Sequence, residues 1–154
     1  MPSGNWTRSA GFYKNHPSVT GQILADSGGI AVCGRTITDV DPDDCHSALE
    51  ALCIVVHGDQ QKQLVRQLTA AALTMAAGGA TFTDFVACDT VCQNPSATKS
   101  QLANCIEQTD DFNLSGDSLP SPIDTGGGAD HGPCDEAFDT PCWVLDGLSC
   151  AVCP

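Results

Sequence analysis

Positive charge and aromatic side chains are scarce in this sequence of 154 residues. Six Lys and Arg stand against nineteen Asp and Glu, so the formal net charge is −13, and the sequence pI is about 4.2. An acidic surface repels the phosphates of nucleic acids and of anionic membranes, so neither is an expected partner. Because aromatic residues make up only 5% of the chain, its core must depend mainly on Leu, Ile, Val, Ala and Cys.

Long apolar runs, an export leader and familiar catalytic motifs are also missing. No apolar run reaches the roughly 18 residues of a membrane-spanning helix, so direct membrane insertion is not expected. The chain begins MPSGN rather than with a basic and then apolar leader, and we expect that a natural leader has been removed. No HExxH motif, G-x-S-x-G elbow or phosphate-binding loop occurs, so the sequence does not favour an enzymatic function.

Cysteine, by contrast, is abundant. Secreted domains use cysteines for disulfides, whereas cytosolic proteins rarely contain so many without a metal. We therefore predict an extracellular or cell-surface protein with up to five disulfides, each worth about 2–4 kcal/mol through the entropy of the unfolded chain. The pairing stays open, because spacing does not define it. The ten cysteines are Cys33, Cys45, Cys53, Cys88, Cys92, Cys105, Cys134, Cys142, Cys150 and Cys153.

Metal sites are alternative interpretations of two parts of the sequence. The acidic segment DVDPDDCHSALE matches positions 1, 3, 5 and 12 of a helix–loop–helix calcium loop, where hard oxygen ligands can surround one Ca²⁺. Asp44 replaces the usual Gly at position 6 and Pro42 lies inside the loop, so a turn followed by an acidic helix start explains the same residues. A four-thiolate zinc site from CDTVC and CAVC is less favoured, because six cysteines would remain unused. The predicted calcium ligands are Asp39, Asp41, Asp43 and Glu50.

Hydrophobic periodicity predicts a mainly α fold: a small disulfide-stapled domain of about four helices, one short β-hairpin and an irregular Cys-rich C-terminal segment. The clearest helix runs from its cap, Asp59, to about Ala77. Further helices are expected over residues 17–26, 43–56, 83–91 and 96–109, and a hairpin over residues 30–38 with its turn at Gly34. The core face of the clearest helix comprises Leu64, Val65, Leu68, Ala71, Ala72 and Met75.

The composition changes near residue 115. Residues 1–114 are expected to form the helical domain. Residues 115–154 are expected to be an acidic Gly/Pro-rich linker and a Cys-rich tail that disulfides pack back onto the domain. Ten acids and no Lys or Arg follow Cys105, so the acidic charge is concentrated in this later part.

Residues 11–17, GFYKNHP, resemble the GYWKNHP signature near the start of a family of secreted bacterial domains, often found in cell-surface or anchored proteins. The likeness extends through AVCGRTIT, VVHGDQQKQLVRQLTAAALTMAAGG and QLANCIEQTDDFN, and so covers about residues 7–113. The chain departs from the signature by Phe12-Tyr13 in place of Tyr-Trp and by its many cysteines. The resemblance implies a secreted structural or adhesive role and supplies no catalytic residues.

The chemistry of this motif predicts a packing clasp that holds the N-terminal arm onto the two long helices. Phe12 and Tyr13 are expected to anchor a ring-poor core, and Gly11 to permit an unusual backbone turn. Asn15 and His16 can bond loop backbone groups, and the final proline can begin a helix. The motif residues are Gly11, Phe12, Tyr13, Lys14, Asn15, His16 and Pro17.

These features predict a secreted structural or surface-interaction protein that binds proteins or cell-surface components and can assemble with copies of itself. A calcium-binding extracellular module, with Ca²⁺ held by the predicted loop, is the alternative. A hydrolytic enzyme is less favoured, and Lys14 and His16 with an acidic partner would be its first group to test.

Overall fold

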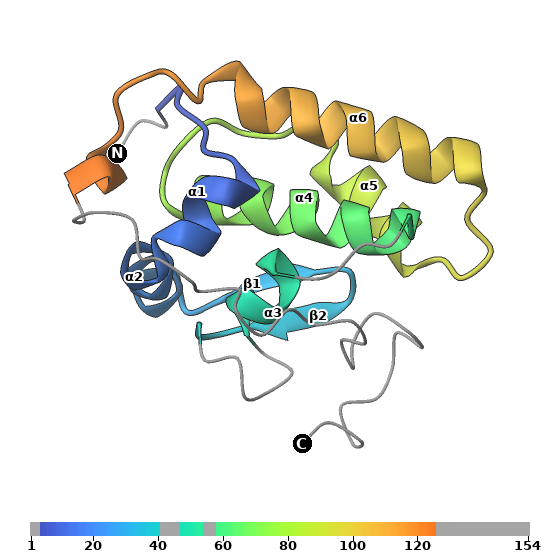
Figure 1. The fold of residues 1–154 in the computed structure, drawn as a ribbon, viewed down its shortest axis with the longest axis horizontal. Coiled ribbons are helices and arrows are strands. Elements are labelled where there is room, and N and C mark those ends of the chain that lie inside the picture. Colours follow the sequence, from blue (N-terminus) through green and yellow to red (C-terminus); the bar gives the residue numbers. More distant parts are fainter. Residues whose placement is uncertain (1–3, 41–46, 54–57, 126–154) are drawn as a thin grey trace.

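The computed structural model of the protein describes residues 4–40, 47–53 and 58–125, which are mainly helical (Figure 1). Two short strands, β1 (Ile30–Val32) and β2 (Arg35–Ile37), pair as an antiparallel hairpin. The predicted fold class is confirmed, although the described residues contain six α-helices rather than about four. The helices are α1 (Ala10–Asn15), α2 (Pro17–Ser27), α3 (Ala48–Leu52), α4 (Gln60–Ala76), α5 (Phe85–Gln93), α6 (Lys99–Ser115) and a short 3-10 helix, η1 (Pro122–Thr125).

Helix α4 lies at the centre of the fold, where α6 packs along it and α1, α2, α3, α5 and β1 also contact it (Figure 1). As predicted, Asp59 caps this helix, because its carboxylate accepts a hydrogen bond from the Lys62 N–H at 3.1 Å. The predicted core face is buried except for Met75, which is partly exposed. Neighbours surround the helix so closely that the polar Thr69 and Thr74 are buried as well. Among the described helices, none has the length and apolar character needed to cross a membrane.

The two later helices are shifted relative to the prediction. Helix α5 covers Phe85–Gln93 rather than residues 83–91. Helix α6 begins after Thr98 rather than after Ser96, because Thr98 and Gln101 form a capping box with hydrogen bonds of 3.1 and 2.9 Å. It also continues beyond residue 109 to Ser115, since Phe112 packs against the core there.

Helix α3 is shorter than predicted. It begins after Ser47, whose hydroxyl accepts a hydrogen bond from the Glu50 N–H at 3.2 Å, and it ends at Leu52. The cap is therefore Ser47 and not an aspartate at position 43 or 44. Residues 43–46 and 54–56 of the predicted helix lie outside the described residues.

The β1–β2 hairpin turns at Cys33 and Gly34, as the sequence predicted for Gly34. Their φ angles are 54° and 82°, and two successive positive values define the turn that suits tight hairpins. A positive φ is unusual for a residue with a side chain, so Cys33 needs support from its surroundings. Helix α5 provides it: the Asp89 carboxylate accepts a hydrogen bond from the Cys33 N–H at 2.5 Å, and Cys92 forms a disulfide with Cys33.

Two disulfides link three successive parts of the chain. Cys33–Cys92 ties the hairpin to α5, and Cys88–Cys105 ties α5 to α6. Cys53 is also disulfide-bonded, so every cysteine in the described residues is oxidised. The pairs are separated by 59 and 17 residues, and loop closure of those lengths corresponds to about 4 and about 3 kcal/mol of stabilisation.

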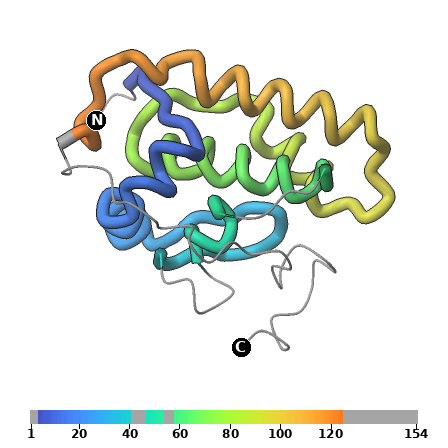
Figure 2. Tube along the Cα trace, in the orientation of Figure 1, coloured from blue at the N-terminus to red at the C-terminus, as the bar shows by residue number. Residues whose placement is uncertain are grey.

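Residues 4–9 form an extended N-terminal arm that passes between the ends of α4 and α6. Figure 2 shows the arm running beside the segment that follows α6. The Thr7 N–H donates to the carbonyl of Gly116 at 3.1 Å, and the Ala80 N–H donates to the carbonyl of Trp6 at 2.9 Å. The arm lies so close to Gly116 that a Cβ atom there would collide with the carbonyl oxygen of Asn5 and lie 2.9 Å from the Thr7 nitrogen. Glycine is therefore required at the crossing.

Candidate functional site

The GFYKNHP motif is helical rather than a loop. Gly11 to Asn15 belong to α1, His16 forms the corner between α1 and α2, and Pro17 opens α2 as predicted. The predicted unusual turn at Gly11 is wrong, because Gly11 lies inside α1 and does not have a positive φ. The helix is possible here because Ser9 caps it, with its hydroxyl accepting from the Phe12 N–H at 3.3 Å.

Tyr13 is the part of the motif that reaches the core. Its side chain is 0% exposed, and its hydroxyl lies 2.6 Å from the hydroxyl of Thr74 on α4. Burial raises the pKa of Tyr13 far above its ordinary value, so this side chain stays protonated. A neutral phenol hydrogen-bonded inside the core serves as a packing anchor, which agrees with the clasp interpretation.

The remaining motif side chains stabilise the α1–α2 corner. The imidazole of His16 stacks on the ring of Phe12, with centroids 4.2 Å apart, and its Nδ1 donates to the Phe12 carbonyl at 2.7 Å. The Thr20 hydroxyl donates to the carbonyl of Tyr13 at 2.8 Å, which ties α2 back to α1. Because Nδ1 of His16 donates its hydrogen bond to a backbone carbonyl, the imidazole has a structural role at this corner.

Arg8, which no sequence motif indicated, organises the neighbouring segment. Arg8 is buried, with 5% of the residue exposed. Its guanidinium donates to the carbonyls of Gly116, Asp117 and Leu119 at 3.2, 3.0 and 2.5 Å. It also makes a bidentate ion pair with Asp124, with N–O distances of 3.1 and 2.6 Å. We call this set of contacts the Arg8 latch. It fixes residues 116–124, the start of the predicted linker, against the arm.

The electrostatics of the latch follow from its geometry. The hydrogen bonds from Arg8 lower the pKa of Asp124, so the carboxylate stays ionised to lower pH than an isolated aspartate. The Asp124 side chain is 41% exposed, which screens its charge. Much of the contribution of Arg8 therefore lies in the backbone carbonyls it satisfies.

The predicted calcium loop is only partly described. Asp39 and Ser47 form an isolated parallel bridge in which the Ala48 N–H donates to the Asp39 carbonyl at 2.9 Å, so the two ends of the segment come together. Glu50 is 5% exposed within α3. Asp41 and Asp43 lie outside the described residues. In the ranges that are described, no three or more acidic, His or Cys side chains gather as a metal-binding group, and calcium binding stays a prediction.

The structure also bears on the cysteine predictions. Cys88 and Cys92, which would form half of a zinc site, belong to separate disulfides and offer no thiolates for a metal. They pair with other elements and not with each other. The predicted disulfide cysteines that lie outside the described residues are Cys45, Cys134, Cys142, Cys150 and Cys153.

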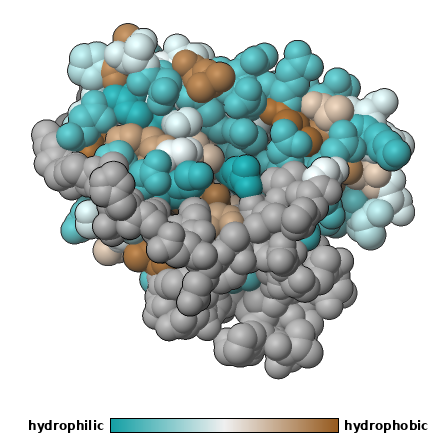
Figure 3. Space-filling model, viewed as in Figure 1, coloured by the Kyte–Doolittle hydropathy of each residue, from teal (hydrophilic) through white to brown (hydrophobic). Residues whose placement is uncertain are grey.

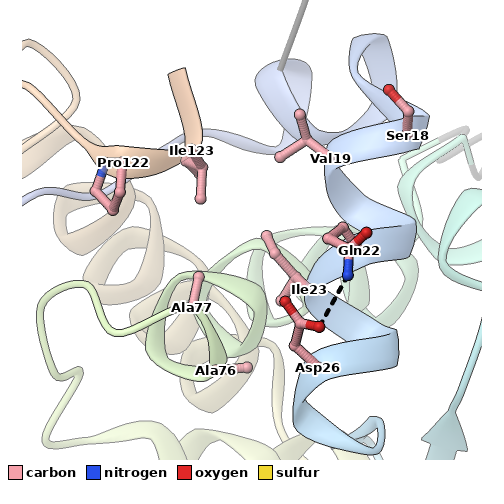
Figure 4. A pocket seen from close by; sticks show the side chains of 9 residues that line it. All are labelled: Ser18, Val19, Gln22, Ile23, Asp26, Ala76, Ala77, Pro122 and Ile123. Carbon is pink, nitrogen blue, oxygen red and sulfur yellow. Dashed lines mark hydrogen bonds between the residues drawn. The ribbon is translucent and has the colours of Figure 1, made fainter. Parts of the chain in front are cut away.

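A pocket of about 550 Å³ lies next to the motif, between α2, the end of α4 and η1 (Figure 4). Val19 and Ile23 of α2 face Ala77 and Ile123 across it, which gives it an apolar interior. Its rim on α2 is polar: the Gln22 amide donates to the Asp26 carboxylate at 2.8 Å. Sequence reasoning missed this pocket, because its walls come from three segments far apart in the chain.

No family model, no curated protein and no solved structure matches this chain. The resemblance of GFYKNHP to a secreted bacterial signature therefore stays a prediction.

Proposed function

We propose that the protein is a secreted structural or surface-interaction module that acts outside the cytosol. The observation that carries this proposal is the pair of disulfides, Cys33–Cys92 and Cys88–Cys105, which join the hairpin, α5 and α6. Disulfides form and persist in oxidising compartments and are rare in cytosolic proteins. A domain braced in this way suits an environment without chaperones or reducing agents.

The hydrogen bonds of the polar side chains in the motif and the arm favour an interaction role over catalysis by those residues. Tyr13, His16 and Arg8 all direct their polar atoms to groups of the same chain. The surface that is available to partners is acidic, because the chain has a net charge of −13. Hydrophilic residues prevail over α6 in Figure 3, with apolar groups scattered between them. Such a surface favours cationic partners, and association with its own copies would require screening of the repulsion between them.

Labelling of intact cells of the organism that produces the protein tests the location. A membrane-impermeant amine reagent should modify the protein before lysis, since Lys99 is exposed, and a cytosolic protein serves as the negative control. N-ethylmaleimide should add no mass to peptides that contain Cys33, Cys88, Cys92 or Cys105 unless a reductant is present. Labelling only after lysis, together with full alkylation of these cysteines, would overturn the proposal.

Chemical crosslinking on the same intact cells tests the interaction. We expect crosslinked species that contain this chain and a second surface protein or a further copy. A surface-exposed protein that remains monomeric under all crosslinking conditions would contradict the interaction part of the proposal while leaving its location intact.

A further inference from the structure

We propose that the pocket between α2, the end of α4 and η1 binds a basic, apolar peptide segment of a partner protein. The segment would place an aliphatic side chain inside the pocket and a neighbouring Lys or Arg at its rim. This inference rests on the proposed surface-interaction function and specifies the class of partner. Its basis is the combination of an apolar interior with a negative rim.

The interior of the pocket can accept an aliphatic side chain. Val19 and Ile23 form one wall, and Ala77 and Ile123 form the opposite wall (Figure 4). A volume of about 550 Å³ lies within the range that ligand pockets usually have. The Arg8 latch holds η1 through Asp124, the residue after Ile123, so the second wall is fixed to the domain.

The rim of the pocket is negative for two independent reasons. Asp26 lies in the last turn of α2 and contributes a carboxylate. Helix α4 ends at the pocket, where Ala76 and Ala77 belong to the wall, and the carbonyl end of a helix carries roughly half an elementary negative charge. Neither helix has a basic residue in its last turn. An acid at a helix C-terminus is unfavourable for the helix, and a cation from outside would relieve that repulsion.

Asp26 is also arranged to receive a cation. The Gln22 amide binds Oδ1 of Asp26 at 2.8 Å and so orients the carboxylate along the rim. The second oxygen retains its capacity to accept hydrogen bonds from an ammonium or guanidinium group. Gln22 and Asp26 are both exposed, so a peptide chain can reach them while its aliphatic side chain enters the pocket.

A partner protein is a better occupant than a second copy of this chain. The chain has only six Lys and Arg, and its net charge of −13 repels a copy. The same charge attracts a basic segment and speeds its encounter with the pocket. The open rim also fits a peptide that crosses the surface better than a small molecule enclosed on all sides.

The experiment compares two short peptides on the isotope-labelled full-length protein by NMR. The first is acetyl-Gly-Leu-Lys-Leu-Gly-amide, and the second has Gln in place of Lys. We expect the Lys peptide to shift the signals of Val19, Ile23 and Ile123 and to bind about threefold more tightly than the Gln peptide at low salt. Raising the salt concentration should reduce this preference.

Asp26→Asn tests the charge without disturbing the core, because the side chain is exposed. The variant should lose most of the preference for the Lys peptide, because only the partial negative charge at the end of α4 remains. Its affinity for the Gln peptide should be unchanged. Asp111→Asn is the matched control, since Asp111 is an exposed acid near the end of α6 and outside the pocket. It should retain the threefold preference.

Three outcomes would overturn the inference. They are no binding of the Lys peptide, equal binding of the two peptides by the unmodified protein, and shifts confined to another surface. Concentration-dependent shifts of Ile23 and Ile123 without peptide would assign the pocket to a second copy instead. Because cell labelling tests location separately, a failed peptide experiment with a surface-exposed, oxidised protein would remove only this partner class.

Discussion

The two ends of the α4–α6 pair are held by different chemistry. At one end, the hairpin, α5 and the middle of α6 are joined by Cys33–Cys92 and Cys88–Cys105. At the other end, the N-terminal arm, Arg8 and residues 116–124 are joined by hydrogen bonds and one ion pair. Disulfides act mainly by limiting the unfolded chain, whereas the contacts of the arm act only in the folded state. The first region should therefore respond most to reduction, and the second to small changes in geometry.

Removal of the longer disulfide should have the largest effect. Cys33→Ser with Cys92→Ser should lower the free energy of unfolding by about 4 kcal/mol, because the bond closes a long loop and supports the positive φ of Cys33. Cys88→Ser with Cys105→Ser, which opens the shorter loop, should lower it by about 3 kcal/mol. Urea unfolding of the oxidised variants measures both values. Equal losses of unfolding free energy in the two double variants would contradict the expected dependence on loop length.

At the other end, a single methyl group should be enough to disturb the arm. Gly116→Ala places a Cβ against the backbone of Asn5 and Thr7 and should cost about 3 kcal/mol, since backbone cannot move aside as a side chain can. Gly11→Ala is the control: it lies inside α1, where the nearest atom to a new Cβ is 3.6 Å away, and it should stabilise the protein by about 0.5–1 kcal/mol. Thermal unfolding of the two variants should shift in opposite directions. A neutral Gly116→Ala would refute the close crossing.

The hydrogen bond that anchors the motif should contribute less. Tyr13→Phe keeps the ring but removes the contact with Thr74, and should lower stability by about 1 kcal/mol. Thr74 also accepts from the Arg8 N–H at 3.4 Å, so a double-mutant cycle with Thr74→Val is needed to isolate the pair. The coupling energy should also be about 1 kcal/mol. A coupling near zero would mean that the ring alone anchors the motif.

The smallest effects should be opposite pH dependences at the two ends. Arg8 lowers the pKa of Asp124, so this residue stabilises the fold above its ordinary pKa near 4 and loses that contribution as pH falls through the lower folded value. Burial raises the pKa of Asp89, whose bonds from Cys33 and Gln93 only partly compensate. Stability should therefore fall as pH rises from about 4 through the folded pKa of Asp89.

Asp124→Asn and Asp89→Asn separate these two contributions. Unfolding free energies measured between pH 2.5 and pH 6 should rise less with pH in Asp124→Asn than in the unmodified protein, and rise more in Asp89→Asn. Both carboxylates are at least partly exposed, so salt should weaken the effect of Asp124 in particular. Changes of the same sign in both variants would contradict the assignment.

The sequence predicted those elements whose ends and buried faces are defined by residues close together in the chain. Asp59 and the apolar spacing that follows it define α4, and Gly34 marks the hairpin turn. Helix α1 was missed because it is only six residues long and contains Gly11, which weakens any local helix signal. The boundaries of α3 and α6 were misplaced because Ser47 and Thr98 compete with other good capping residues nearby.

Long-range contacts could not be predicted in the same way. Arg8 binds carbonyls and a carboxylate more than 100 residues away, and nothing in its neighbours along the chain indicates those partners. The pocket is built from α2, the end of α4 and η1, so no single stretch of sequence carries its pattern. The cysteines indicated disulfides, but their pairing depended on how α5 lies between the hairpin and α6.

The two disulfides overlap along the chain, because Cys88 lies inside the loop closed by Cys33–Cys92 and Cys105 lies beyond it. A protease that cuts the backbone once anywhere between Cys33 and Cys105 therefore cuts inside at least one closed loop. Both fragments remain joined covalently, and the nicked protein keeps its mass on a gel until a reductant is added. Wherever reductant is absent, the overlapping disulfides would keep such a chain in one piece after a first cleavage.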